Sequence, residues 1–237
     1  MKIPVIIDGQ LVKVEKGTSV IKAAGIAGIT IPTLCYHDAL KPYGACRICM
    51  VEVIYQKQRR VVTACNFPTE AGMEVHTDTA KVREIRRMVI RLLLARCPDV
   101  PILKKLAQSM GIEDIKLKQK DEKECILCGL CVRFCDEVVG ANAIGLSNRG
   151  IEREVTTPFK VLSGTCIGCG SCTYICPTGC IEMVVDGEKT GMRMEMGNIS
   201  IDPCQDNYEC ETCDVDKEFM TTVKRVFAEF RNKYSSH

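Results

Sequence analysis

Two runs of cysteines with the same internal spacing constrain this chain more than any other feature. Each run reads C-x2-C-x2-C-x3-C. The first run is Cys125, Cys128, Cys131 and Cys135, and the second is Cys166, Cys169, Cys172 and Cys176, followed by Pro177. A loop this short can present its first three thiolates to one cluster, while the fourth thiolate binds a different cluster. This is the pattern of a domain that binds two [4Fe–4S] clusters.

In this pattern the last cysteine of each run binds the cluster that the other run holds. One predicted ligand set is therefore Cys125, Cys128, Cys131 and Cys176, and the other is Cys166, Cys169, Cys172 and Cys135. Gly129, Gly168 and Gly170 are expected to allow tight turns that aim amide N–H groups at sulfur. Asp136, rather than proline, follows Cys135, and this departure removes no ligand.

Zinc binding and disulfide bonding are the alternatives for so many cysteines. Zinc sites use separated pairs of ligands rather than a run of three with a remote fourth. Disulfides require an oxidising compartment, but the N-terminal residues 1–9 show no apolar region or cleavage site of a secretory signal. The total of 17 cysteines is odd, which fits poorly with complete pairing. We therefore favour clusters and expect a cytoplasmic protein.

A third set of four cysteines lies near the N-terminus. Cys35, Cys46, Cys49 and Cys65 are spaced C-x10-C-x2-C-x15-C. Plant-type [2Fe–2S] proteins use C-x4-C-x2-C and a distant cysteine, so the first interval is longer here. Gly44 gives the loop flexibility, and Arg47 can offset the negative charge of a cluster. We predict a [2Fe–2S] site, with four buried structural thiols as the alternative.

The residues around this set indicate a small α+β domain over 1–77. Apolar residues alternate or run together over residues 3–14 on both sides of Asp8-Gly9, which predicts a β-hairpin. A short helix is expected to begin at Thr18 or Ser19. Two further strands are expected over 51–55 and 60–63.

A helical linker region is expected over 78–123. Its clearest helix covers 79–96, with an apolar stripe formed by Val82, Ile85, Val89, Leu92 and Leu93. The arginines of this helix are expected on a solvated basic face, and a docking face for an acidic partner is the alternative; they are Arg83, Arg86, Arg87 and Arg91. Pro101 can begin a second helix that runs to Met110, and residues 113–124 are charged and resemble a linker.

The C-terminal half is divided into a two-[4Fe–4S] domain over 124–190 and a tail over 191–237 with an amphipathic helix at 216–234. Five cysteines remain unassigned. Cys204, Cys210 and Cys213 in the tail suggest a further metal site, for which an additional [4Fe–4S] cluster is preferred, with Cys180 or Cys97 as the fourth ligand. The alternatives are unligated tail thiols or a site shared with a partner.

Several segments together resemble a known family. They are residues 35–37, 44–53, 63–66, 72–77, 125–139, 148–150 and 157–159. These segments are similar to the N-terminal part of the large iron–sulfur subunit of respiratory complex I, to the diaphorase iron–sulfur subunit of NAD-linked hydrogenases, and to iron-only hydrogenases. The similarity covers residues 1–186.

The resemblance implies an α+β fold with an N-terminal β-grasp [2Fe–2S] domain and a bacterial ferredoxin-like domain after the linker. The family has a His and three Cys for another cluster between these domains. Here Cys97 stands at the His position and the three cysteines are absent, so that cluster is expected to be missing or rebuilt. We also expect no catalytic domain before the chain ends at His237.

The predicted function is that of an iron–sulfur subunit that relays single electrons between an NAD(P)-linked flavoprotein subunit and a catalytic subunit. The complex would be of the hydrogenase, formate dehydrogenase or bifurcating reductase type. A freely diffusing polyferredoxin is the alternative, and a regulatory sensor is disfavoured because no output element is seen.

Several classes of partner and site are not expected. No glycine-rich dinucleotide motif lies at a strand–helix junction, so NAD(P) and flavin are expected on a partner. The net charge of +2 gives no argument for nucleic acid, and no stretch approaches the roughly 20 apolar residues of a membrane span. We predict no catalytic residue.

Overall fold

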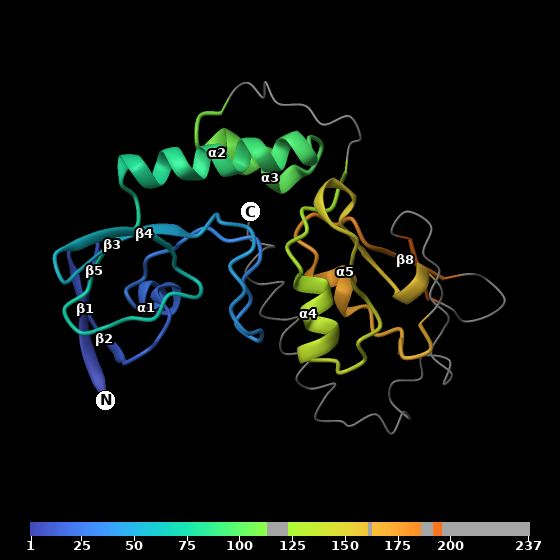
Figure 1. The fold of residues 1–237 in the computed structure, drawn as a ribbon, viewed down its shortest axis with the longest axis horizontal. Helices are drawn as coiled ribbons and strands as arrows, with labels where there is room; N and C mark the ends of the chain where they lie inside the picture. The colour runs from blue at the N-terminus through green and yellow to red at the C-terminus, as the bar shows by residue number, and fades with distance from the viewer. Residues whose placement is uncertain (113–122, 161–162, 186–191, 196–237) are drawn as a thin grey trace. The chain divides into compact units, whose positions relative to one another are not determined.

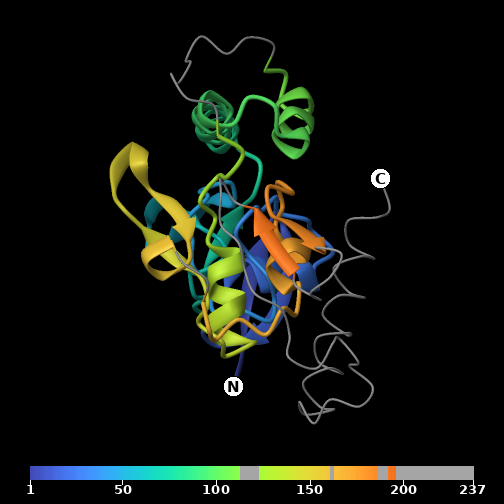
Figure 2. The same ribbon diagram turned by 90° about the vertical axis from the view of Figure 1, so that its right-hand side faces the viewer.

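The structure is a computed structural model that describes residues 1–112, 123–160, 163–185 and 192–195 (Figures 1 and 2). These residues divide into two units. Unit 1 comprises Met1–His37 and Lys41–Cys128, and unit 2 comprises Asp38–Leu40 and the described residues from Gly129 onward. The predicted tail helix and nearly all of the charged stretch 113–124 lie outside the described residues.

The first hairpin of unit 1 follows the predicted pattern. Strands β1 (Lys2–Ile7) and β2 (Gln10–Glu15) pair antiparallel. Asp8 and Gly9 join them with φ values of 45° and 82°, the left-handed conformations that the right-handed twist of a two-residue hairpin favours. Alternate side chains of β1 are buried, which places one face of the hairpin on the core.

Three more strands complete a five-stranded sheet. Strands β3 (Met50–Tyr55) and β4 (Gln58–Thr63) confirm the predicted second pair. The short strand β5 (Glu74–His76), which the sequence pattern does not predict, pairs parallel with β1 and antiparallel with β3. The order is β2-β1-β5-β3-β4. Helix α1 (Val20–Ile26) buries Val20, Ala23 and Ala24 in the same core as the sheet, which confirms the α+β, β-grasp-like arrangement.

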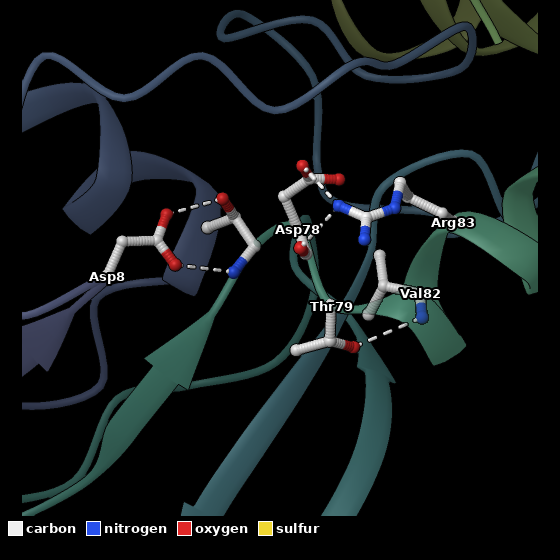
Figure 3. A network of polar contacts seen from close by, with 6 residues as sticks. Asp8, Asp78, Thr79, Val82 and Arg83 are labelled. Carbon is white, nitrogen blue, oxygen red and sulfur yellow. Dashed lines mark hydrogen bonds and ion pairs between the residues drawn. The ribbon is translucent and has the colours of Figure 1, made fainter.

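Helices α2 (Ala80–Arg96) and α3 (Pro101–Ser109) follow the sheet. The Oγ1 of Thr79 accepts a hydrogen bond of 3.2 Å from the Val82 amide and caps α2, as Figure 3 shows. Pro101 occupies the first turn of α3, as predicted.

The buried face of α2 differs from the predicted stripe. Its buried residues are Val82, Arg86, Ile90 and Leu94. Leu92 is 54% exposed, whereas Arg86 is only 6% exposed, so the prediction that Arg86 lies on the solvated basic face is wrong. The reason is that α2 carries more apolar residues than one stripe can hold, and packing against β3 selects the i, i+4 row.

Unit 2 is built around two short helices, α4 (Leu130–Glu137) and α5 (Ser171–Ile175), which pack against each other. Its strands form two hairpins: β6 (Gly145–Ser147) with β7 (Glu154–Thr156), and β8 (Glu182–Val185) with β9 (Met192–Glu195). Two single 3-10 turns, Gly150–Glu152 and Pro158–Lys160, flank β7. Phe134, Ile175 and Ile181 are almost fully buried and form part of its core. Figure 2 shows α4 in yellow-green and the β6–β7 hairpin in yellow.

Candidate iron–sulfur sites

The four N-terminal cysteines are positioned by one long loop and one hairpin. Cys35, Cys46 and Cys49 lie on the loop between α1 and β3, and Cys49 directly precedes β3. Cys65 is the second residue after β4. The Ala64 amide donates a hydrogen bond of 3.0 Å to the Cys49 carbonyl, so the strand register brings Cys49 and Cys65 together. All four residues are at most 7% exposed.

The four thiols interact with one another in unit 1. The amide of Cys46 donates to Cys35 Sγ at 3.4 Å. A hydrogen bond with Cys35, together with burial, raises the pKa of Cys46, and a hydrogen bond with Cys65, together with burial, raises the pKa of Cys49. Negative charge on Cys35 also acts to raise the pKa values of Cys49 and Cys65. The predicted set is therefore brought into one buried group.

Backbone amides around this group point at sulfur. Those of Ile48 and Leu34 hydrogen-bond to Cys46, and that of Gly44 to Cys65. Such bonds favour the thiolate form, which is the form that binds metal. Four buried sulfurs with N–H donors directed at them, and no competing buried carboxylate among the described residues of this loop, suit a [2Fe–2S] cluster.

The loop around the cysteines requires left-handed backbone. Gly44 has φ +74°, and a Cβ there would lie 2.9 Å from Asn66 Nδ2. Arg47, between Cys46 and Cys49, has φ 58°, a conformation that costs a non-glycine residue about 1 kcal/mol or more. The Arg47 side chain is exposed.

In unit 2, Cys135 faces the second cysteine run. Burial raises the pKa of Cys135, and the charge of Cys169 raises it further. Charge on Cys169 and Cys135 also acts to raise the pKa values of Cys166 and Cys172. Burial is the largest cause at Cys172 and raises its pKa to about 12. The structure thus groups Cys135, near the end of α4, with Cys166, Cys169 and Cys172, the three cysteines of the second run that the predicted set combines it with.

The two runs share a backbone conformation as well as a spacing. Leu127 and Gly168, at matching positions, have φ values of 54° and 66°, and Gly129 and Gly170 have 72° and 70°. Gly129 and Gly170 are also the residues that precede α4 and α5. The Leu127 amide donates to Cys125 Sγ at 3.4 Å, and the Gly168 amide hydrogen-bonds to Cys166. In both loops, therefore, the amide two residues after the first cysteine of the run donates to the sulfur of that cysteine.

The other predicted [4Fe–4S] set is Cys125, Cys128, Cys131 and Cys176. Cys131 lies on α4, and Cys176 directly follows α5. The Sγ of Cys176 lies 3.6 Å from Cys180 Sγ and 3.3 Å from Thr178 Oγ1. The hydrogen bond with Cys180 lowers the pKa of Cys176 to about 5.

The cysteines proposed for a further site are only partly described. Cys97 is fully buried at the C-terminal end of α2, and burial raises its pKa to about 11. Cys180 lies beside Cys176, and Cys204, Cys210 and Cys213 lie outside the described residues.

Three further observations apply to the described ranges alone. Their fourteen cysteines form no disulfide. No three His, Cys, Asp or Glu side chains in them surround a position for a single metal ion. None of their helices combines the length and the apolar character that crossing a bilayer requires.

Two residues that shape the N-terminal site were not predicted from the sequence. Asn66 packs against Gly44 and accepts a hydrogen bond from Thr63 Oγ1. Arg86 is buried on α2 and donates to the carbonyl of Met50, the residue after Cys49. An arginine inside a mostly apolar helix face was the available signal for Arg86, and none pointed to Asn66.

Comparison with protein families matches both cysteine regions. Residues 1–80 match a 2Fe-2S iron-sulfur cluster binding domain, and residues 119–183 match a 4Fe-4S dicluster domain. The resemblance to the complex I iron–sulfur subunit is confirmed by its relatives. The chain is 36% identical to the NADPH-Fe(3+) oxidoreductase subunit alpha of Geobacter sulfurreducens, over 73% of this chain and 23% of that protein.

Two more comparisons support the same family. The chain is 31% identical to the mitochondrial NADH-ubiquinone oxidoreductase 78 kDa subunit of Candida albicans, over 76% of this chain and 28% of that protein. It also superposes on a chain of an NAD+-reducing [NiFe]-hydrogenase in the H2-reduced state, with a TM-score of 0.58 and 26% identity, over 65% of this chain and 74% of that one. The chain spans about a quarter of the length of the curated relatives it matches.

Proposed function

We propose that this chain is an electron-transfer subunit that relays single electrons from an NAD(P)-linked flavoprotein subunit to a catalytic oxidoreductase subunit. The observation that carries the proposal is the presence, on one chain, of a 2Fe-2S domain followed by a 4Fe-4S dicluster domain. The relatives it matches are named as subunits of NADH and NADPH oxidoreductases. We propose domain boundaries at 1–77, 78–123, 124–190 and 191–237.

The proposed ligands are the three cysteine sets predicted from spacing. When bound, the clusters supply one-electron redox chemistry, and a plant-type [2Fe–2S] centre works near about −400 mV. The chain's own residues exclude water, hold the thiolates in place and direct amide N–H groups at sulfur, which tunes the potential. The burial of Cys35, Cys49 and Cys65 to 1% exposure supports this role for the N-terminal site.

The alternative is a freely diffusing polyferredoxin that carries electrons between enzymes. The relatives of this chain are named as subunits, which favours a multi-subunit complex over a free carrier. The exposed basic row of α2 also favours a complex, because it suits an acidic partner surface; it consists of Arg83, Arg87 and Arg91. We also propose a cytoplasmic location.

Anaerobic isolation of the native protein from its own cells separates these functions. We expect the chain to elute in a large, flavin-containing assembly whose clusters bleach when NADH or NADPH is added. Elution as a flavin-free monomer whose clusters are not reduced by either nucleotide would favour the polyferredoxin.

A further [4Fe–4S] cluster at Cys204, Cys210 and Cys213, completed by Cys180 or Cys97, remains part of the proposal. Replacing the three tail cysteines with serine should lower the iron content from about 14 to about 10 atoms per chain. An iron content that is about 10 in both proteins would show that the tail holds no cluster.

A further inference from the structure

Arg86 is a buried cation beside the N-terminal cysteine site. It is 6% exposed, and its Nη2 donates a hydrogen bond of 2.6 Å to the Met50 carbonyl. Its Nε is buried and has no hydrogen-bond partner among the described residues. A buried, incompletely paired guanidinium is costly, so a role that repays this cost is expected.

The charges that act on Arg86 identify its surroundings. Burial lowers its pKa, while Asp78, Cys49 and Asp8 act in the opposite direction. No described carboxylate is within ion-pair distance of Arg86, and Asp78 instead pairs with the exposed Arg83 at 2.9 Å. Arginine remains protonated in proteins despite such a shift. The guanidinium is therefore a fixed positive charge, and its hydrogen bond to the Met50 carbonyl places it one residue along the chain from Cys49.

We propose that Arg86 is a positioning residue that raises the reduction potential of the [2Fe–2S] cluster held by Cys35, Cys46, Cys49 and Cys65. The inference rests on the proposed function, because it requires a cluster at these thiols. Four thiolates make such a centre negative, and reduction adds one more negative charge. A nearby cation with little solvent screening stabilises the reduced form more than the oxidised form.

The contact with Met50 gives the charge a fixed position. Met50 is the first residue of β3 and directly follows Cys49. Arg86 therefore joins α2 to the segment that carries a ligand, and the same side chain provides both the charge and its placement. A merely structural role would keep α2 on the sheet without changing the potential.

The test is a redox titration of the full-length, cluster-loaded chain, followed by EPR of the reduced [2Fe–2S] signal. Arg86→Gln and Arg86→Met remove the charge and keep much of the side chain, whereas Arg86→Lys keeps the charge. Lys81→Gln is the matched control, because it removes an exposed positive charge from the same helix. We expect a more negative midpoint in both neutral variants, and wild-type-like midpoints in Arg86→Lys and Lys81→Gln.

Each other result has a defined meaning. Neutral variants that keep the cluster at the wild-type midpoint would overturn the inference alone, and a wild-type chain without a [2Fe–2S] signal would overturn the proposed function with it. If both neutral variants lose the cluster while Arg86→Lys retains it, the charge is needed to hold the cluster rather than to set its potential, and the inference is overturned. Loss in all three variants would show a structural role and overturn it.

Discussion

Gly44, on the loop that carries the N-terminal cysteines, has no room for a side chain. Its φ of +74° is left-handed, and its missing Cβ leaves room for Asn66, which is itself held by Thr63. Its amide also hydrogen-bonds to Cys65. A single glycine thus sets the path of the loop and directs a donor at a proposed ligand.

Gly44→Ala is expected to destabilise the chain more than Gly28→Ala does. Gly28 has nearly the same φ, +73°, but a Cβ there meets nothing within 4 Å. Gly28→Ala should therefore cost about 1 kcal/mol from φ alone, and Gly44→Ala about 2 kcal/mol or more, because Asn66 must also move. Urea unfolding of the two variants gives the difference directly. Equal losses would mean that the contact with Asn66 carries no energy.

At the scale of elements, the turn between β1 and β2 is tied to the end of β5. The Asp8 carboxylate, shown in Figure 3, accepts hydrogen bonds from the Thr77 amide at 2.8 Å and from the Thr77 hydroxyl at 2.5 Å. Asp8 lies 69 residues before Thr77, so these bonds join segments that only the fold brings together. Thr77 also lies two residues before Thr79, the N-cap of α2. The bonds to Asp8 therefore fix the segment that connects β5 to α2.

Asp8→Ala should lower the free energy of unfolding by about 2 kcal/mol, because it removes both bonds and places alanine at φ 45°. Asp8→Asn keeps an acceptor oxygen and tolerates this backbone, so about half of that loss is expected. The two midpoints of denaturation are compared under the same conditions. An alanine variant no less stable than the asparagine variant would argue against the tie.

In the predicted ligand sets of the [4Fe–4S] clusters, the last cysteine of each run binds the cluster of the other run, and Cys135 tests this crossed assignment. Cys135 lies on α4, in the first run, yet interacts with Cys169 of the second run. Cys135→Ala should therefore abolish the same [4Fe–4S] EPR signal as Cys166→Ala, and each should lower the iron content by about four atoms. Cys131→Ala should abolish the other signal. If Cys135→Ala and Cys131→Ala remove the same signal, the crossed assignment is wrong.

Elements that depend on local patterns were predictable from the sequence. The Asp8-Gly9 hairpin, the start of α2 near residue 79 and Pro101 at the start of α3 are each set by residues within one turn of one another. Strand β5 was missed because three residues show no periodicity, and its pairing with β1 and β3 is set by distant segments. The buried face of α2 was wrong because contact with β3, rather than periodicity, selects it.

At the scale of the whole molecule, the cysteine spacing predicted two cluster-binding domains because ligand spacing is itself a local property. The family comparisons confirm a 2Fe-2S domain and a 4Fe-4S dicluster domain in that order. The burial of Arg86 was not predicted, because the face of α2 that is buried depends on how the helix packs on a strand that begins at Met50, 36 residues earlier in the sequence. The tail cysteines lie outside the described residues, and their role stays a prediction.

Iron and acid-labile sulfide per chain, measured together with EPR on anaerobically purified protein, test the central claim most directly. One [2Fe–2S] and two [4Fe–4S] clusters predict about 10 iron and about 10 sulfide, with one plant-type and two cubane signals after reduction. An additional tail cluster raises both values to about 14. Fewer than about 8 iron atoms, or zinc in their place, would contradict the account.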